Sequence, residues 1–296
     1  MKITAVVVTY NRLSLLKECL AAVQNQSIIP HEIIVVNNSS TDGTEEWLNT
    51  QQLHVIKQEN RGGSWGYYSG VKKAVEQNAD WIWIMDDDTI PNNDALEKLL
   101  AVINYGIDNI GFLSSKAVWT DGTAHKMNLQ DIKTFSGNTA FNEYDDKGML
   151  LVGSASFVSL LVSANAVRKA GLPIKEFFIW ADDSEFTSRI CRCGFRGGYV
   201  PASIVLHKTA THYSADMFTD DVKNLWRYRY GVRNGLFMIR RQKGYFKLFM
   251  QVLKRFFVYP FRIMKKRKDH QWEFIKMVWA ASFEALLFNP EIEYDE

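Results

Sequence analysis

Short apolar runs alternate with helical segments along the first hundred residues, and this alternation restricts the fold more than any other feature. The expected strands are 3–8, 33–36, 53–56 and 81–85, and the expected helices are 13–23, 44–48, 67–75 and 94–103. Runs that are apolar on both faces favour a parallel sheet covered by helices on both sides. The sequence therefore predicts an α/β fold of βαβ units, in which ligands bind beyond the carboxyl ends of the strands.

Three carboxylates, Asp86, Asp87 and Asp88, directly follow the expected strand 81–85. Side chains alternate along an extended chain, so Asp86 and Asp88 are expected to point the same way. Two like charges held together need a cation or raised pKa values, and Mg²⁺ or Mn²⁺ bridged to substrate phosphates meets that need. The alternative is a solvated acidic turn that caps the next helix. The place at the end of an inner strand favours metal and diphosphate binding.

Polar residues also follow the other strands. Thr9-Tyr10-Asn11-Arg12 follows the first strand and Asn37-Asn38-Ser39-Ser40 the second, while the glycine-rich segment 60–66 opens the third helix. Glycines at such a place let backbone N–H groups approach a phosphate or a sugar at the positive end of the helix. Ordinary turn chemistry is the alternative, and for Asn11 and Ser40 we regard it as equally supported.

Taken in order, segments 7–12 and 34–44 and the aspartate triplet resemble the family-2 inverting glycosyltransferases with a GT-A nucleotide-sugar fold. The resemblance covers about residues 1–210 and implies a Rossmann-like, mostly parallel sheet. Enzymes of this family move a sugar from a nucleoside diphosphate donor and hold a divalent metal with an Asp-x-Asp motif. One departure is Asn37, where many relatives carry Asp, because Asn offers a donor as well as an acceptor.

The resemblance assigns expected roles to individual residues. Asp86 and Asp88 would hold Mn²⁺ or Mg²⁺. The residues expected to bind the donor are Thr9, Tyr10, Arg12, Asn38, Gly62, Gly63, Ser64, Trp65 and Asp87. In relatives a histidine after the last strand completes the metal shell, which implies His207 as third ligand and favours Mn²⁺. His212 competes for that role, and an isolated histidine is more often structural.

A second acidic focus, Asp182 and Asp183, lies in the segment 178–186. Inverting transfer needs a base that takes the proton of the acceptor hydroxyl, and a carboxylate within hydrogen-bonding reach can do so. The segment resembles the family's base-bearing motif, and aligning Arg189 with the family's arginine makes Asp183 the base, with Asp182 as the neighbouring candidate. The alternative is an acidic first helical turn that the helix dipole favours.

Residues 222–268 contain 15 Lys and Arg and no Asp or Glu. One face of the expected helix is basic, with Lys247, Gln251, Lys254, Arg255, Arg262 and Lys265. The opposite face is apolar, with Phe246, Phe249, Met250, Leu253, Phe256 and Phe257, and Pro260 must kink or break the helix. Such a pattern is typical of a helix that lies on an anionic membrane surface. Packing of its aromatic residues on the catalytic domain is equally supported. Segment 226–234 resembles one that is common in bacterial galactofuranosyl- and rhamnosyltransferases, where arginines could meet acceptor phosphate.

The expected function is metal-dependent, inverting transfer of galactofuranose from UDP-galactofuranose to a lipid-linked or polysaccharide acceptor in bacterial cell-surface glycan synthesis. Rhamnose transfer from a dTDP donor is the alternative, and both sugars rest on the resemblance alone. A nucleic-acid-binding protein would use the basic segment but leaves the acidic clusters unexplained, so we expect no nucleic-acid partner.

The expected domains are a catalytic domain over 1–215 and a helical C-terminal region over 216–296. Within the first, the nucleotide-binding part covers about 1–110 and the acceptor part about 111–215. Three cysteines are too few for a disulfide framework, and neither a signal segment nor a membrane span is expected. We therefore expect a cytoplasmic protein that is peripheral at the inner face of the cell membrane. Formation of a homo-oligomer is left open.

Overall fold

The structure is a computed structural model and describes residues 1–132, 139–212 and 214–294. Its contacts divide the chain into two compact units. The first unit comprises Met1–Lys175, Asp183–Tyr213 and Ile292–Glu296, and the second comprises Glu176–Asp182 and Ser214–Glu291.

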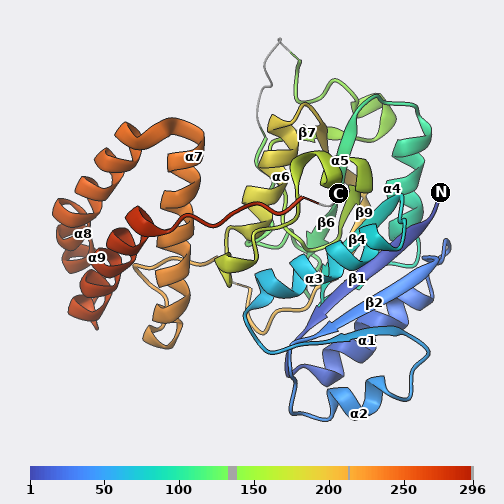
Figure 1. Cartoon of the computed structure of the whole chain (residues 1–296), viewed down its shortest axis with the longest axis horizontal. Coiled ribbons are helices and arrows are strands. Elements are labelled where there is room, and N and C mark those ends of the chain that lie inside the picture. Colours follow the sequence, from blue (N-terminus) through green and yellow to red (C-terminus); the bar gives the residue numbers. More distant parts are fainter. Residues whose placement is uncertain (133–138, 213, 295–296) are drawn as a thin grey trace. The chain divides into compact units, whose positions relative to one another are not determined.

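A nine-stranded sheet forms the centre of the first unit (Figure 1). Its strands are β1 (Ile3–Thr9), β2 (Glu32–Asn37), β3 (His54–Lys57), β4 (Trp81–Asp86), β5 (Thr89–Pro91), β6 (Ile110–Val118), β7 (Leu150–Val152), β8 (Leu160–Ser163) and β9 (Arg196–His207). They lie in the order β3-β2-β1-β4-β8-β6-β9-β5, and β7 pairs with β9. The pairings give β1, β2, β3, β4, β6 and β9 one direction and β5, β7 and β8 the opposite one. The mostly parallel sheet expected from the sequence is confirmed.

Helices cover both faces of this sheet. They are α1 (Leu13–Gln24), α2 (Thr44–Leu48), α3 (Gly63–Glu76), α4 (Ala95–Asn104), α5 (Ala164–Ala170) and α6 (Asp182–Arg192). The helices expected at 13–23, 44–48 and 94–103 agree with α1, α2 and α4 to within one residue at each end. The exception is α3, which begins four residues earlier than expected, because the helical pattern of its apolar residues becomes visible only after the glycine-rich start.

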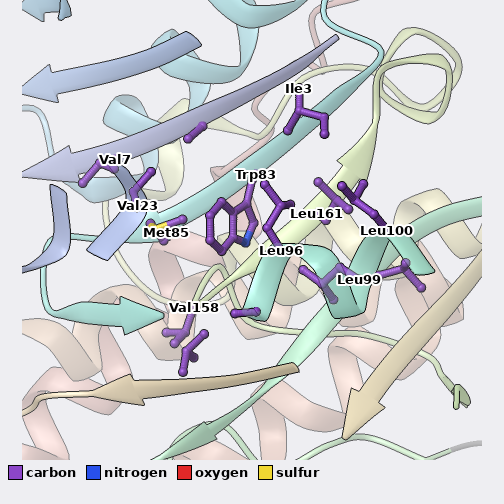
Figure 2. Close-up of a cluster of buried hydrophobic side chains, with 14 of the residues drawn as sticks. Ile3, Val7, Val23, Trp83, Met85, Leu96, Leu99, Leu100, Val158 and Leu161 are labelled. Atoms are coloured by element: carbon purple, nitrogen blue, oxygen red, sulfur yellow. The ribbon is translucent and has the colours of Figure 1, made fainter. Parts of the chain in front are cut away.

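Alternate residues of the central strands supply two separate apolar cores. On one face Trp83 and Met85 of β4 lie with residues of α1 and α4, among them Leu96 and Leu99, as Figure 2 shows. On the other face the neighbouring strand residues pack against α3, α5 and α6. Because both faces of each inner strand are buried, polar groups gather at the strand ends, where the chain leaves the sheet.

Two glycines allow α3 to lie very close to β1. A Cβ atom added to Gly66 would lie 2.5 Å from Cγ1 of Val8, and one added to Gly70 would lie 2.3 Å from Cγ1 of Val6. Contacts this short do not occur between real side chains, so only glycine permits this approach. The glycines of α3 therefore serve packing as well as the start of the helix.

The second unit is helical, with α7 (Leu225–Phe257), α8 (Tyr259–Lys266) and α9 (Gln271–Leu287) around a core of its own. The break expected at Pro260 is present, since α7 ends at Phe257 and Pro260 lies in the first turn of α8. A further kink at Gly244, with φ of 80° and ψ of 174°, was not expected. In the parts of the chain that the structure describes, every helix is too short or too polar to cross a membrane.

We expect Gly70→Ala to lower the free energy of unfolding of the first unit by about 1–3 kcal/mol, the usual cost of overpacking a filled core. Gly235→Ala is the control, because Gly235 lies within α7 and a Cβ atom there meets open space. That substitution should be neutral or stabilise by up to about 1 kcal/mol. Chemical denaturation of both variants measures the difference, and equal effects would contradict the close packing of α3 on β1.

Candidate active site

The three residues expected to bind a metal come together at the carboxyl end of β4. Asp86 is the last residue of β4 and pairs with Val8 in β1, while His207 is the last residue of β9 and pairs with Thr89 in β5. One ligand atom each of Asp86, Asp88 and His207 lies within 4.8 Å of the others. Residues more than a hundred positions apart in the sequence are thus brought together by the pairing of β5 with β9.

The side chains at this point fit a divalent cation. Oδ1 of Asp88 is buried and accepts no hydrogen bond from the described residues. Nε2 of His207 lies 3.4 Å from that oxygen. A buried carboxylate oxygen without a partner is costly unless something else satisfies it. Two carboxylates and an imidazole are a ligand set that suits Mn²⁺ and related divalent ions.

Asp87 is held by residues that follow β1. The hydroxyl of Thr9 donates to Oδ2 of Asp87 over 2.8 Å. The guanidinium of Arg12 donates to Oδ1 of Asp87 over 3.2 Å and to Oδ2 of Asp88 over 2.7 Å. Thr9, Arg12 and Asp87 are all expected to bind the donor. They therefore lie directly beside the candidate metal-binding group, which consists of Asp86, Asp88 and His207. Their contact with a donor stays a prediction.

The charges of this cluster perturb one another. Burial and the charge of Asp88 raise the pKa of Asp86, and burial raises the pKa of Asp87 to about 7 although Arg12 opposes the shift. Burial also acts to raise the pKa of Asp88, but His207 and Arg12 together bring it below its usual value. Near neutral pH, Asp87 is therefore partly protonated, unlike an ordinary aspartate.

The loops after β1 and β2 are tied to each other by turn chemistry. The backbone N–H of Asn11 donates to Oγ of Ser40 over 2.9 Å, and Oδ1 of Asn11 accepts from the backbone N–H of Thr41 over 2.7 Å. Asp42 accepts from the backbone N–H of Leu13, at the start of α1, over 2.9 Å. The turn alternative for Asn11 and Ser40 is therefore present in the structure.

The remaining candidates after β1 and β2 differ in exposure. Tyr10 is exposed, whereas Asn38 is buried and its Oδ1 accepts from Nε2 of Gln58 over 2.8 Å. Oδ1 of Asn37 accepts from the backbone N–H of Ser40 over 3.0 Å, so this amide closes a turn at the end of β2. Tyr10 and Asn38 remain candidates for the nucleotide pocket.

The glycine-rich start of α3 contributes a residue that the sequence analysis missed. Gly62 has a φ of 93°, Ser64 is buried, and the ring of Trp65 lies 5.0 Å from the guanidinium of Arg61. One turn further, the hydroxyl of Tyr67 donates to Oδ1 of Asp86. The sequence carries no signal for this contact, because Tyr67 reaches Asp86 only through the close packing of α3 on β1.

A small polar pocket is lined in part by Asn128, whose side chain also contacts His207. Its volume is about 80 Å³, and it is lined by Met127, Asn128, Leu129, Gln130, Ser154, Ala155, Ser156, Asp183 and Ser184. Oδ1 of Asp183 accepts from the backbone N–H of Ser184 over 2.6 Å. Asp182 is buried and is not among the lining residues. Of the two candidate bases, the pocket favours Asp183.

Arg189, the residue used to align the base-bearing motif with the family, has a structural role. It makes a buried ion pair with Glu185 at 2.9 Å and donates to the backbone carbonyls of Ala170, Gly171 and Leu172. These carbonyls lie at the end of α5 and just beyond it, where a helix leaves acceptors without partners. Arg189 thus fastens α6 to the end of α5 and fixes the helix that begins at the acidic pair.

Within the second unit, the segment that precedes the acidic pair is strained and is held by α7. Phe178, Trp180 and Ala181 have φ values of 67°, 65° and 68°, a left-handed conformation that is sterically unfavourable for residues other than glycine. The buried amide of Asn234 donates to the backbone carbonyls of residues 177, 179 and 180. Arg233 donates to the carbonyls of residues 176 and 177. Segment 226–234 therefore holds this loop. The sequence suggests that arginines of this segment could meet acceptor phosphate, and in the structure Arg233 donates to backbone carbonyls.

The two histidines considered as third metal ligand, His207 and His212, make different contacts. His207 belongs to the group that could hold a metal ion, whereas the ring of His212 stacks on Trp119 with 4.9 Å between centroids. His125 lies between them, with its ring 4.3 Å from that of His207. Burial and the two neighbouring histidines lower the pKa of His125 to about 4, so it is neutral at physiological pH.

Comparison with known proteins identifies relatives of the chain. Residues 4–149 match the family model described as glycosyl transferase family 2. The galactofuranosyltransferase GlfT1 of Mycolicibacterium smegmatis is 28% identical over 225 residues, which are 71% of this chain and 72% of that protein. GlfT1 of Mycobacterium tuberculosis H37Rv is 26% identical over 298 residues, which are 92% of this chain and 93% of that protein.

A solved structure has a similar fold. The mannosyltransferase PcManGT from Pyrobaculum calidifontis, in complex with GDP-Man and Mn²⁺, matches with a TM-score of 0.56 at 18% identity, over 97% of this chain and 74% of that chain. At this identity the likeness concerns the fold, and the GT-A fold expected from the sequence is confirmed.

We expect the stabilising effect of Mn²⁺ to grow between about pH 6 and about pH 8. The pKa of Asp87 is raised to about 7, and that of the proposed ligand Asp86 is also raised. The stability that the raised pKa of Asp87 gives the metal-free protein in acid is lost as the pH rises through 7. A cation must displace a proton from Asp86, and the negative charge of deprotonated Asp87 beside it attracts the cation, so the cation binds better when both protons have already left. Thermal unfolding with and without Mn²⁺ at the two pH values measures the effect. The double variant Asp86→Asn/Asp88→Asn should show no shift, and an equal shift of the wild type at both pH values would contradict the prediction.

Proposed function

The chain carries a glycosyl transferase family 2 domain, and from this premise we propose that it is a metal-dependent, inverting galactofuranosyltransferase that uses UDP-galactofuranose. The two mycobacterial relatives named galactofuranosyltransferase support the choice of sugar. The observation that carries the proposal is the meeting of Asp86, Asp88 and His207 at the carboxyl end of β4. Among them, Oδ1 of Asp88 is buried and accepts no hydrogen bond from any residue that the structure describes.

Asp86, Asp88 and His207 would hold Mn²⁺ or Mg²⁺, which when bound neutralises the charge that develops on the leaving diphosphate. Arg12 adds a positive charge at the same place, because Asp87 and Asp88 fix its guanidinium while its side chain stays half-exposed. Thr9, Tyr10, Asn38, Asp87 and residues 62–65 are the proposed donor-binding residues around this group.

Asp183 is the proposed base. An acceptor hydroxyl in the pocket lined by Asp183 would attack the anomeric carbon of the sugar as its proton passes to the Asp183 carboxylate. The bond from the anomeric carbon to the diphosphate oxygen breaks on the opposite face, and UDP leaves with the bonding electrons. Attack opposite to the leaving group inverts the configuration at that carbon.

The variant Asp183→Asn should lose about 10²- to 10⁴-fold in kcat, the usual contribution of a general base, while UDP and Mn²⁺ still bind within a few-fold of wild-type affinity. Asp182→Asn is the matched neighbour and should keep most of its activity. Transfer from UDP-galactofuranose to a lipid-linked glycan acceptor, with calorimetric titration of UDP and Mn²⁺, measures both.

Loss of UDP binding in Asp183→Asn would remove this residue from the role of base. Turnover of dTDP-rhamnose in place of UDP-galactofuranose would overturn the sugar assignment while leaving the transferase in place.

The acceptor is proposed to be lipid-linked, with the second unit on an anionic membrane surface. The aromatic–basic segment, residues 241–268, exposes Tyr245, Phe246, Phe249, Met250, Phe257, Phe261 and Met264. Exposed cations lie among them at Arg241, Lys243, Lys247, Lys254, Lys265, Lys266 and Lys268. Of the apolar face expected from the sequence, Leu253 and Phe256 are half-buried, and Phe256 stacks on Trp279. Exposed aromatic groups beside lysines favour the interface of an anionic bilayer, at the cytoplasmic face of the membrane.

The double variant Phe246→Ser/Phe249→Ser should lower binding to phosphatidylglycerol-containing vesicles by about tenfold or more, since each buried aromatic side chain contributes about 1.5–3 kcal/mol. Tyr105→Ser is the control, because Tyr105 is an exposed aromatic residue at the end of α4, outside the segment. Vesicle co-sedimentation at low and high salt measures the effect. Wild-type binding that is the same for neutral and anionic vesicles would contradict the proposal.

A further inference from the structure

Asn128 connects the metal-binding group with the pocket that contains Asp183. Its Oδ1 lies 2.7 Å from Nδ1 of His207, and its Nδ2 donates to Oγ of Ser156 over 2.8 Å. Asn128 and Ser156 both line the pocket. One short side chain therefore touches the proposed third metal ligand on one side and the wall of the proposed acceptor pocket on the other.

The hydrogen bonds of Asn128 select one form of the His207 ring. A neutral imidazole carries its proton on one nitrogen and a lone pair on the other. The amide nitrogen of Asn128 is used by Ser156, so its oxygen faces Nδ1 of His207, which must then carry the proton. The lone pair is left on Nε2, 3.4 Å from Oδ1 of Asp88. In this form His207 presents a lone pair to the place where the carboxylates converge, and a lone pair is what a metal ligand needs.

The backbone around Asn128 is also fixed. Its N–H donates to the carbonyl of His125 over 3.0 Å, and the ring of His125 lies against that of His207. Nε2 of His125 is hydrogen-bonded to Oγ1 of Thr209 at 2.8 Å. The ring of His207 is thus held from two directions, by the amide of Asn128 and by the ring of His125.

We propose that Asn128 is a positioning residue, which holds His207 with its Nε2 lone pair directed at the metal-binding carboxylates. The inference rests on the proposed function, because it assumes that Asp86, Asp88 and His207 hold a divalent cation. It adds that the affinity for this cation depends on a residue that touches the acceptor pocket. A change in that pocket at Asn128 is then transmitted to the metal through the His207 ring.

Titration calorimetry with Mn²⁺ alone tests the inference on full-length wild type and four variants. Asn128→Leu should bind Mn²⁺ about 10- to 100-fold more weakly, the usual effect of losing the partner of a ligating histidine. Asn128→Asp keeps an oxygen acceptor for Nδ1 and should stay within a few-fold of wild type. Asn142→Leu makes the same substitution at an exposed position of the loop region and should bind as wild type. Asp88→Asn should lose binding.

The variants separate the two proposals. Wild-type affinity in Asn128→Leu, together with lost binding in Asp88→Asn, would overturn the role of Asn128 and leave the metal site in place. Equal weakening in Asn128→Leu and Asn128→Asp would also overturn it, because the acceptor oxygen would then not matter. Unchanged binding in Asp88→Asn would overturn the metal site and the inference together. Thermal unfolding of the metal-free variants shows that each is folded.

Discussion

Three consecutive carboxylates at the end of β4 are the constraint on which the rest of the site depends. Aspartates held this close and out of water repel each other, and their charged forms are tolerated only where other groups compensate. The compensation comes from separate segments: Thr9 and Arg12 after β1, Tyr67 in α3, and His207 at the end of β9. The cluster therefore adds polar contacts between the ends of strands and helices that already pair or pack through their apolar parts. Oδ1 of Asp88 accepts no hydrogen bond from the residues that the structure describes, so the compensation within this part of the chain is incomplete.

The packing of the sheet and the electrostatics of the site are linked through α3. Gly66 and Gly70 let this helix lie against β1, and only at that distance does Tyr67 reach Asp86. On the other side, the pairing of β5 with β9 carries His207 to the carboxylates, and Asn128 joins His207 to the pocket of Asp183. The proposed metal, donor and acceptor positions thus share residues that are in direct contact with one another.

The second unit combines a strained loop that α7 holds with an exposed aromatic and basic surface. In α7, the buried amide of Asn234 donates to the backbone carbonyls of residues 177, 179 and 180, in a segment where three residues have a left-handed conformation. Such backbone persists only where its surroundings hold it, and it is often found at functional sites. The same unit exposes aromatic and basic side chains together in the aromatic–basic segment, which suits a partner with an apolar interior and an anionic surface.

Local patterns were sufficient to predict much of the chain. Apolar runs that are buried on both faces indicate inner strands, and apolar residues at helical spacing indicate helices, so the central strands and several helices follow from the sequence. The aspartate triplet could be placed at a strand end for the same reason, whereas His207 is singled out by the family resemblance. The early start of α3, the kink at Gly244 and the antiparallel strands β5, β7 and β8 could not, because each depends on contacts between distant segments. The contacts of Tyr67 with Asp86 and of Asn128 with His207 belong to the same class. Hydrophobic periodicity encodes which face of an element is buried, whereas the partner of a polar side chain is decided only when the strands pair and the helices pack.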